Sequence, residues 1–185
     1  MENIIKDLLS PKRFEHSMSV AKLAVEMAEH LGADTQKAYL AGVVHDIAKE
    51  MPADDLKKYC DEHGIKLCSI EKNNTVLLHA PVGAELIKEY GILDEDVQNA
   101  VRYHTVGRAG MTCLEKIIYL ADMIEPGRTF PEASELRKIW REDFSLALLK
   151  AFGYSISWNV SQGKLIHEGT VQAFNDVLPE RKNNK

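Results

Sequence analysis

Residues 42–50 read GVVHDIAKE, where an imidazole, a carboxylate and an ammonium group interrupt an apolar segment. A helix over about residues 35–50 accounts for the apolar positions, and Pro52 ends it because proline disfavours helical geometry in the preceding residue. Burying His45 beside Asp46 costs several kcal/mol unless a partner compensates their charge and hydrogen bonds. The candidate partners are a metal ion, a substrate or each other.

Length and composition predict one globular domain over residues 1–185, with a polar tail at about 180–185. The chain is 45% hydrophobic and 28% charged, which suffices for a sizeable core. Its net charge of -5 argues against a general binder of nucleic acid or anionic membranes. The N-terminal segment MENIIKDLLS lacks the long apolar run of a signal peptide or membrane span. Three cysteines without CxxC spacing fit reduced thiols, so we expect a cytoplasmic protein.

The pattern of caps and apolar positions predicts helices along the whole chain. Ser10 is an expected N-cap, and Thr112 with Glu115 forms an expected capping box. No segment alternates strictly between apolar and polar residues, so the predicted fold class is all-α, with a bundle-like arrangement. The first expected helix begins at Pro11, and Thr170 is the expected cap of the last one. The helices expected between them cover about residues 35–50, 54–63, 81–91, 94–104, 113–125, 133–140 and 144–162.

Six ionisable side chains fall inside or at the ends of these apolar segments, on five separate stretches of chain. Helix bundles build metal sites from inward-pointing histidines and carboxylates, and these ligands suit iron, manganese or zinc. A single histidine among apolar residues is more often a hydrogen-bonded core residue than a ligand. The hypothesis of a metal site therefore depends on all six residues together. The six residues are His16, His45, Asp46, His79, His104 and Asp122.

The order of these residues resembles the HD superfamily of metal-dependent phosphohydrolases. A histidine, a His-Asp doublet and a distant aspartate form its signature, and two further histidines resemble the variant with a two-metal centre. Glu168 departs from the pattern, because relatives are expected to carry proline there. Nearly the whole chain resembles YqeK-type symmetrical bis(5'-nucleosyl)-tetraphosphatases through HSMSVAKLAVEMAEH, AGVVHDIAKE, LLHAPVGA, VRYHT, EKIIYLADMIEPGR and LIHEGTVQAFN.

The resemblance implies a single HD domain with a divalent metal held by His16, His45, Asp46 and Asp122. Iron is the expected ion, with manganese or zinc as alternatives. The two further histidines, at positions 79 and 104, either complete a second metal or face the phosphates. In a two-metal centre Asp46 is the natural bridge, because ions about 3.5–4 Å apart can share one carboxylate. The implied catalytic residues are Asp46, Lys49, His79 and His104.

Positive charge near the phosphates is the second requirement of phosphoanhydride cleavage. Lys49 lies one turn after His45 and can reach a bound phosphate, although a solvated lysine at a helix C-terminus is the alternative. Arg128 offers a guanidinium fork, against the alternative of an exposed loop arginine. The start of the last helix could bind phosphate, base or ribose, or could simply be capped by Thr170. The expected substrate-binding residues are His16, Asp46, Ile47, Ala48, Lys49, His79, His104, Asp122, Arg128, His167 and Thr170.

Trp140 and Trp158 could stack on a purine, but an aromatic residue at helical spacing more often belongs to the core. We therefore leave both outside the predicted site.

The resemblance implies symmetric hydrolysis of diadenosine tetraphosphate to two ADP by a water that the metal acidifies. Substrate and product are the expected partners, with neither nucleic acid nor membrane. Two alternatives stay open, namely an HD phosphohydrolase acting on other nucleotides and a non-catalytic regulator that binds metal and nucleotide.

Overall fold

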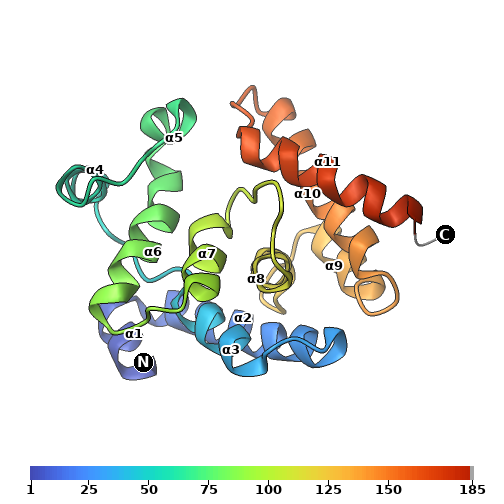
Figure 1. Ribbon diagram of the computed structural model, residues 1–185, viewed down its shortest axis with the longest axis horizontal. Helices are drawn as coiled ribbons and strands as arrows, with labels where there is room; N and C mark the ends of the chain where they lie inside the picture. Colours follow the sequence, from blue (N-terminus) through green and yellow to red (C-terminus); the bar gives the residue numbers. More distant parts are fainter. Residues whose placement is uncertain (184–185) are drawn as a thin grey trace.

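The computed structural model describes the backbone of residues 1–183 and the side chains of residues 1–178. Within this part every regular element is a helix, which confirms the all-α prediction (Figure 1). The elements are α1 (Glu2–Leu8), α2 (Pro11–Leu31), α3 (Thr35–Val44), α4 (Ala53–Glu62), α5 (Ser69–Asn73), the 3-10 helix η1 (Thr75–Leu78), α6 (His79–Glu89), α7 (Glu95–Tyr103), α8 (Cys113–Ile124), α9 (Pro131–Ile139), α10 (Phe144–Ser161) and α11 (Glu168–Asn183).

Helix α8 runs through the middle of the molecule, and its neighbours surround it. It packs against α2, α3, α7, α9 and α10, and Figure 1 shows it nearly end-on between α6 and α7 on one side and α9 to α11 on the other. Most of its side chains are apolar, and Ile117, Ile118 and Leu120 are fully buried. A charged side chain on this helix, such as Asp122, is therefore placed at the centre of the fold.

The pair α2 and α3 packs unusually closely because small residues face each other. A Cβ added to Gly42 would lie 2.5 Å from the Cα of Ala21. Ala24, Ala28 and Ala41 are also fully buried in this core. The close approach fixes the end of α3 against α2.

The predicted helix over 35–50 is wrong in its second half, because α3 ends at Val44 and residues 45–50 form successive turns. In a continuing helix the carbonyl of Gly42 would accept the N–H of Asp46. Here the ring Nδ1 of His45 lies 2.7 Å from that carbonyl oxygen instead. The next residues form hydrogen bonds that span three residues and not four, such as the one from Ile47 N–H to Val44 O (3.0 Å).

Two other helix starts differ from the prediction. Helix α6 begins at His79, with Pro81 in its first turn, where a missing N–H costs no hydrogen bond. Helix α11 begins at Glu168, so Thr170 lies inside it and is not its cap. The ring Nδ1 of His167 accepts the Gly169 N–H (3.0 Å) in that role.

The remaining differences are three short elements that the sequence pattern did not predict, namely α1, α5 and η1, together with details of capping and of the C-terminal end. Thr112 accepts the N–H of Glu115 as predicted, but Arg108 binds the Glu115 carboxylate, so only half of the capping box forms. Helix α11 continues to Asn183 through most of the segment predicted as a polar tail, and residues 184–185 lie outside the described part. No helix within residues 1–183 combines the length and hydropathy needed to cross a membrane.

The substitution Gly42→Ala tests the close packing of α2 on α3. The added methyl group meets backbone atoms of Ala21, so we expect the free energy of unfolding to fall by about 1–3 kcal/mol in urea denaturation. The matched control is Gly153→Ala in α10, where the nearest atom would be Phe174 Cε2 at 3.8 Å. That change should leave stability equal or raise it by up to about 1 kcal/mol. Equal losses in both variants would contradict this packing.

Candidate metal centre

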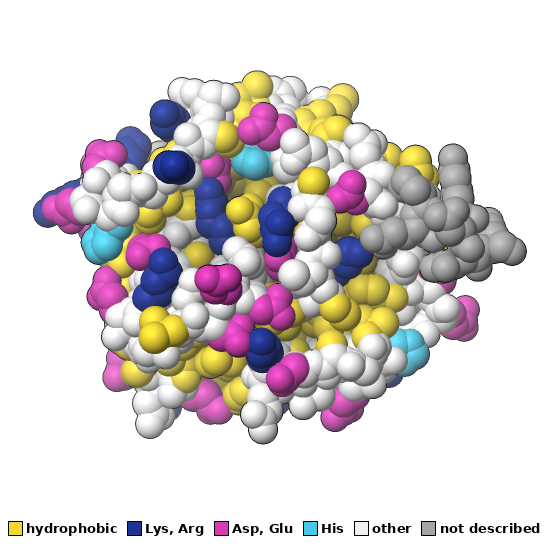
Figure 2. Space-filling view, viewed as in Figure 1, with side chains coloured by type: hydrophobic (Ala, Val, Ile, Leu, Met, Phe, Trp, Pro, Cys, Tyr) yellow, Lys and Arg dark blue, Asp and Glu magenta, His cyan; other side chains and the backbone are white. Residues whose placement is uncertain are grey.

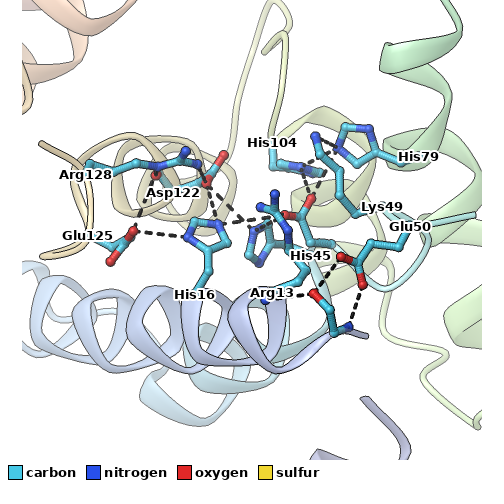
Figure 3. Close-up of polar contacts among 12 residues, drawn as sticks. Arg13, His16, His45, Lys49, Glu50, His79, His104, Asp122, Glu125 and Arg128 are labelled. Atoms are coloured by element: carbon cyan, nitrogen blue, oxygen red, sulfur yellow. Dashed lines mark hydrogen bonds and ion pairs between the residues drawn. The ribbon is translucent and has the colours of Figure 1, made fainter. Parts of the chain in front are cut away.

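The six predicted residues come together between α2, α6, α7 and α8 (Figure 3). His16 projects from α2, the His45-Asp46 doublet from the turn after α3, and Asp122 from α8. The other two histidines occupy the first position of α6 and the position after α7. Four of the six side chains are buried to 2% exposure or less, namely His45, Asp46, His79 and His104.

Asp46 joins two groups of side chains, because its two oxygens face different imidazoles. Its Oδ2 lies 3.4 Å from His45 Nε2 and 3.7 Å from His16 Nε2. Its Oδ1 lies 3.3 Å from His79 Nε2 and 3.5 Å from His104 Nε2. The carboxylate therefore stands between a pair from α2 and α3 and a pair from α6 and α7.

Asp122 completes the first of these groups. Its Oδ1 lies 3.0 Å from His16 Nε2 and 3.9 Å from His45 Nε2. These three residues offer ligand atoms within 4.8 Å of one another, and so do His45, Asp46 and His104.

Three of the histidines are oriented by the same local contact, in which ring Nδ1 faces the carbonyl three residues earlier. A carbonyl only accepts, so Nδ1 carries the proton, and in the neutral ring Nε2 presents its lone pair to the cluster. The sequence places each of these histidines at the end or start of a helix, where the geometry permits the contact. The contacts join His45 to Gly42 (2.7 Å), His79 to Val76 (2.6 Å) and His104 to Val101 (2.7 Å).

His16 is oriented by Glu125, a buried carboxylate that the sequence analysis missed. His16 Nδ1 lies 3.1 Å from Glu125 Oε1, and Glu125 Oε2 accepts the Gly127 N–H at 2.6 Å. Glu125 is 4% exposed and lies three positions after Asp122, on the same face at the end of α8. That spacing from a predicted ligand was the available signal.

The cluster shifts the pKa values of its members in directions set by their neighbours. Burial raises the pKa of Asp46, but the charge of His45 and contacts with His104 and His79 outweigh it and hold this pKa well below its usual range. Burial likewise raises the pKa of Asp122, and contact with His16 together with the charges of His45 and Arg128 reverses the effect. Both carboxylates are therefore ionised at neutral pH.

The pKa values of His45 and His79 move in opposite directions. Burial lowers the pKa of His45, but the charge of Asp46, the contact with its carboxylate and the charge of Asp122 together outweigh burial and raise this pKa above its ordinary value. Burial lowers the pKa of His79, and the charges of His104 and Lys49 lower it further. These effects outweigh the contact with Asp46, which raises the pKa, so the pKa lies below its ordinary value. His79 is accordingly neutral at physiological pH.

The donor set fits a divalent metal. The Nε2 atoms of His16 and His45 are buried and make no well-oriented hydrogen bond to any described residue. Buried nitrogen atoms of this kind cost free energy unless a partner uses them. Imidazole nitrogens combined with carboxylate oxygens suit a first-row divalent ion.

Three cationic side chains border the cluster (Figure 3). Arg128 Nη2 lies 2.5 Å from Asp122 Oδ1, and Lys49 Nζ lies 3.2 Å from His79 Nε2, so both predicted cations reach the site. Arg13 Nη1 lies 2.8 Å from Asp46 Oδ2. Arg13 lies one turn before His16 on α2, and from the sequence it is a weaker candidate for phosphate binding than Lys49 or Arg128.

Four predicted substrate-binding residues lie away from the ligand atoms or are covered. Ile47 and Ala48 are buried in the core, at 3% and 0% exposure. Thr170 is buried and donates to the Val106 carbonyl at 2.8 Å. His167 Nε2 lies 3.3 Å from Cys68 Sγ. The start of α11 thus packs on the turn that follows His104.

A second group of possible ligands, formed by Cys68, Glu71 and His167, is satisfied by hydrogen bonds. Glu71 accepts from Arg102 with one oxygen and from the Cys68 N–H with the other. Because His167 Nδ1 accepts from Gly169, the ring proton lies on Nε2 and points at Cys68 Sγ. These contacts tie the segment before α5 to the start of α11.

Two cavities that Arg128 lines border the cluster. One, of about 250 Å³, is lined by His104 and Asp122 among others. The other, of about 620 Å³, is lined by Arg13, His16 and neighbours on α2. Arg128 lines both cavities and Arg13 lines the larger one, so the arrangement suits an anionic substrate at a metal centre. On the face that Figure 2 shows, Lys and Arg side chains are interspersed with Asp and Glu side chains.

Comparison with known proteins agrees with this geometry. The family model of the HD domain matches residues 13–127. A protein named symmetrical bis(5'-nucleosyl)-tetraphosphatase from Bacillus subtilis (strain 168) is 38% identical over 92% of each chain. A protein of the same name from Staphylococcus aureus (strain NCTC 8325 / PS 47) is 44% identical over 74% of this chain and 70% of that protein.

A solved structure shares the fold along nearly the whole length. The crystal structure of a predicted HD superfamily hydrolase involved in NAD metabolism from Clostridium acetobutylicum has a TM-score of 0.92 at 41% identity. The match covers 97% of this chain and 95% of that chain. With its histidines and aspartates in the predicted order around one centre, the chain belongs to the HD domain family.

Proposed function

We propose that this protein is a symmetrical bis(5'-nucleosyl)-tetraphosphatase that hydrolyses diadenosine tetraphosphate to two ADP. The observation that carries the proposal is the position of Asp46, whose two oxygens face two separate groups of imidazole nitrogens. The relatives that bear this activity in their names support it across 92% of the chain in one case and 74% in another.

The ligands of the proposed centre are those that face Asp46. His16, His45 and Asp122 would hold one ion with Asp46 Oδ2, while His79 and His104 would serve a second with Oδ1. We propose iron, with manganese or zinc as alternatives. When bound, such an ion acts as a Lewis acid and lowers the pKa of a coordinated water.

The chain supplies fixed positive charge where phosphate oxygens would lie. Arg13 contacts Asp46 and Arg128 contacts Asp122, so their guanidinium groups lie at the rim of the cluster. Because His79 is neutral, the adjacent charge comes from Lys49. Such charges stabilise the electron density that develops on non-bridging and leaving oxygens.

The symmetric outcome follows from where the substrate is held. Water adds to one of the two inner phosphorus atoms, and the bond from that phosphorus to the central bridging oxygen breaks. Each half then leaves as ADP, with the water's oxygen on one of them. Gripping one ADP half at a fixed distance from the ligands selects this bond among the three anhydride bonds.

Product analysis tests the proposed reaction. We expect metal-loaded protein to release ADP alone from diadenosine tetraphosphate, as measured by anion-exchange chromatography. Asp46→Ala should abolish turnover, because it removes the residue common to both groups. Lys57→Ala, at a half-exposed position on α4, is the control and should keep full activity. Release of ATP and AMP, or of orthophosphate from other nucleotides with no action on the tetraphosphate, would refute the proposal.

Metal removal tests the cofactor independently of turnover. Chelation by EDTA should lower the melting temperature by about 5–10 °C relative to protein held at about 100 times the metal Kd, because the ion binds only the folded chain. Cys68→Ala should keep this difference, since its cluster is already hydrogen-bonded, whereas Asp46→Asn should lose it. A difference that persists in Asp46→Asn would place the ion elsewhere.

Glu125→Gln tests how His16 is held. Removing the negative charge behind His16 Nδ1 weakens the ring as a ligand, so we expect metal affinity to fall about 10–100-fold in a competitive chelator titration. Glu29→Gln, an exposed position on the same helix as His16, serves as the control and should leave affinity unchanged. If the two variants bind metal equally well, Glu125 does not orient the ligand.

A further inference from the structure

We propose that the groove between the α8–α9 connection and α10 binds the purine base of one half of the dinucleotide. This inference rests on the proposed function and names the part of the protein that recognises the nucleoside. The groove encloses about 700 Å³, within the range of about 300–1,000 Å³ that small-molecule sites occupy. Its lining includes Met123, Phe130, Tyr154, Ser155, Trp158 and Asn159.

Two exposed aromatic side chains from different elements line this groove. Trp158 on α10 is 55% exposed, and Phe130, which precedes α9, is 37% exposed. Trp140, by contrast, is 3% exposed and belongs to the core. The expectation that Trp158 belongs to the core was therefore wrong. Exposed aromatic faces of this kind are stacking surfaces for nucleic-acid bases.

The groove adjoins the cavity at the metal ligands. Met123, Phe130 and Ser155 line both, and the smaller cavity reaches Asp122 and Arg128. The order along this path is charged at one end and aromatic at the other. A nucleotide has the same order, with phosphates at one end and a base at the other.

Charge and polarity within the groove favour a base over other occupants. Its charged lining residue is Glu132, which repels phosphate and therefore directs the polyphosphate towards Arg128. Asn159 Nδ2 donates to the Ser155 carbonyl at 2.8 Å, which fixes the amide and leaves its oxygen as an acceptor for an exocyclic amine. Lys164 Nζ lies 4.2 Å from the centre of the Trp158 ring and covers one face, so the base stacks on the other.

A binding experiment tests the groove without requiring turnover. In Trp140→Phe protein, Trp158 is the sole tryptophan, and its emission should be quenched by ADP and not by inorganic pyrophosphate at equal saturation of the metal-loaded protein. Equal quenching by both ligands, or ADP binding with no change in emission, would overturn the proposal. Emission that responds to protein concentration and not to ADP would also overturn it, by indicating a second copy in the groove.

Kinetics separate this inference from the proposed function. Trp158→Ala should raise KM for diadenosine tetraphosphate on the order of tenfold with little change in kcat, and Trp158→Phe should largely restore it. Leu93→Ala, which removes an exposed apolar side chain away from the groove lining, should leave both parameters unchanged. Wild-type turnover with unaltered KM in Trp158→Ala would refute base binding in the groove and leave the proposed function intact. Quenching by ADP in a protein that does not cleave the tetraphosphate would support the groove and refute the function.

Discussion

The buried carboxylate of Asp46 is the constraint on which the rest of the site depends. It is ionised although burial opposes ionisation, because the charge of His45 and contacts with His104 and His79 hold its pKa low. Four imidazoles and Arg13 surround its two oxygens. A group in this position is stable only when all its neighbours are in place. The segments that supply them, namely α2, the turn after α3, the start of α6 and the end of α7, are thereby tied to a single point between them.

The fold meets this constraint mostly with short-range geometry. Gly42 permits α3 to lie against Ala21 of α2, and its carbonyl orients the His45 ring. The same three-residue contact recurs at the histidines beside α6 and α7. Each ring is therefore set by its own segment, and helix packing has only to bring the segments together. Arg128 and Glu125 then connect the end of α8 to the centre from the other side.

Much of the centre could be predicted from the sequence because its residues conflict with their apolar surroundings. Asp122 between Ala121 and Met123 demands a cation wherever the helix lies, and the His45-Asp46 doublet does so more strongly. The helix end at Val44 could not be predicted this way, since the competing hydrogen bond comes from a side chain of the same segment. Glu125 was missed, and Arg13 was ranked below Lys49 and Arg128, because charged residues near helix ends are ordinary until their partners are known. Trp158 required the actual packing of α10, because periodicity alone does not tell a core face from a groove.

Anomalous diffraction from crystals grown with manganese tests the central claim most directly. The account predicts a peak within coordination distance of His16 Nε2, His45 Nε2, Asp46 Oδ2 and Asp122 Oδ1, and a second peak on the Oδ1 side of Asp46 if two ions bind. A peak beside Cys68, Glu71 and His167, or none at Asp46 in protein that hydrolyses diadenosine tetraphosphate, would contradict it.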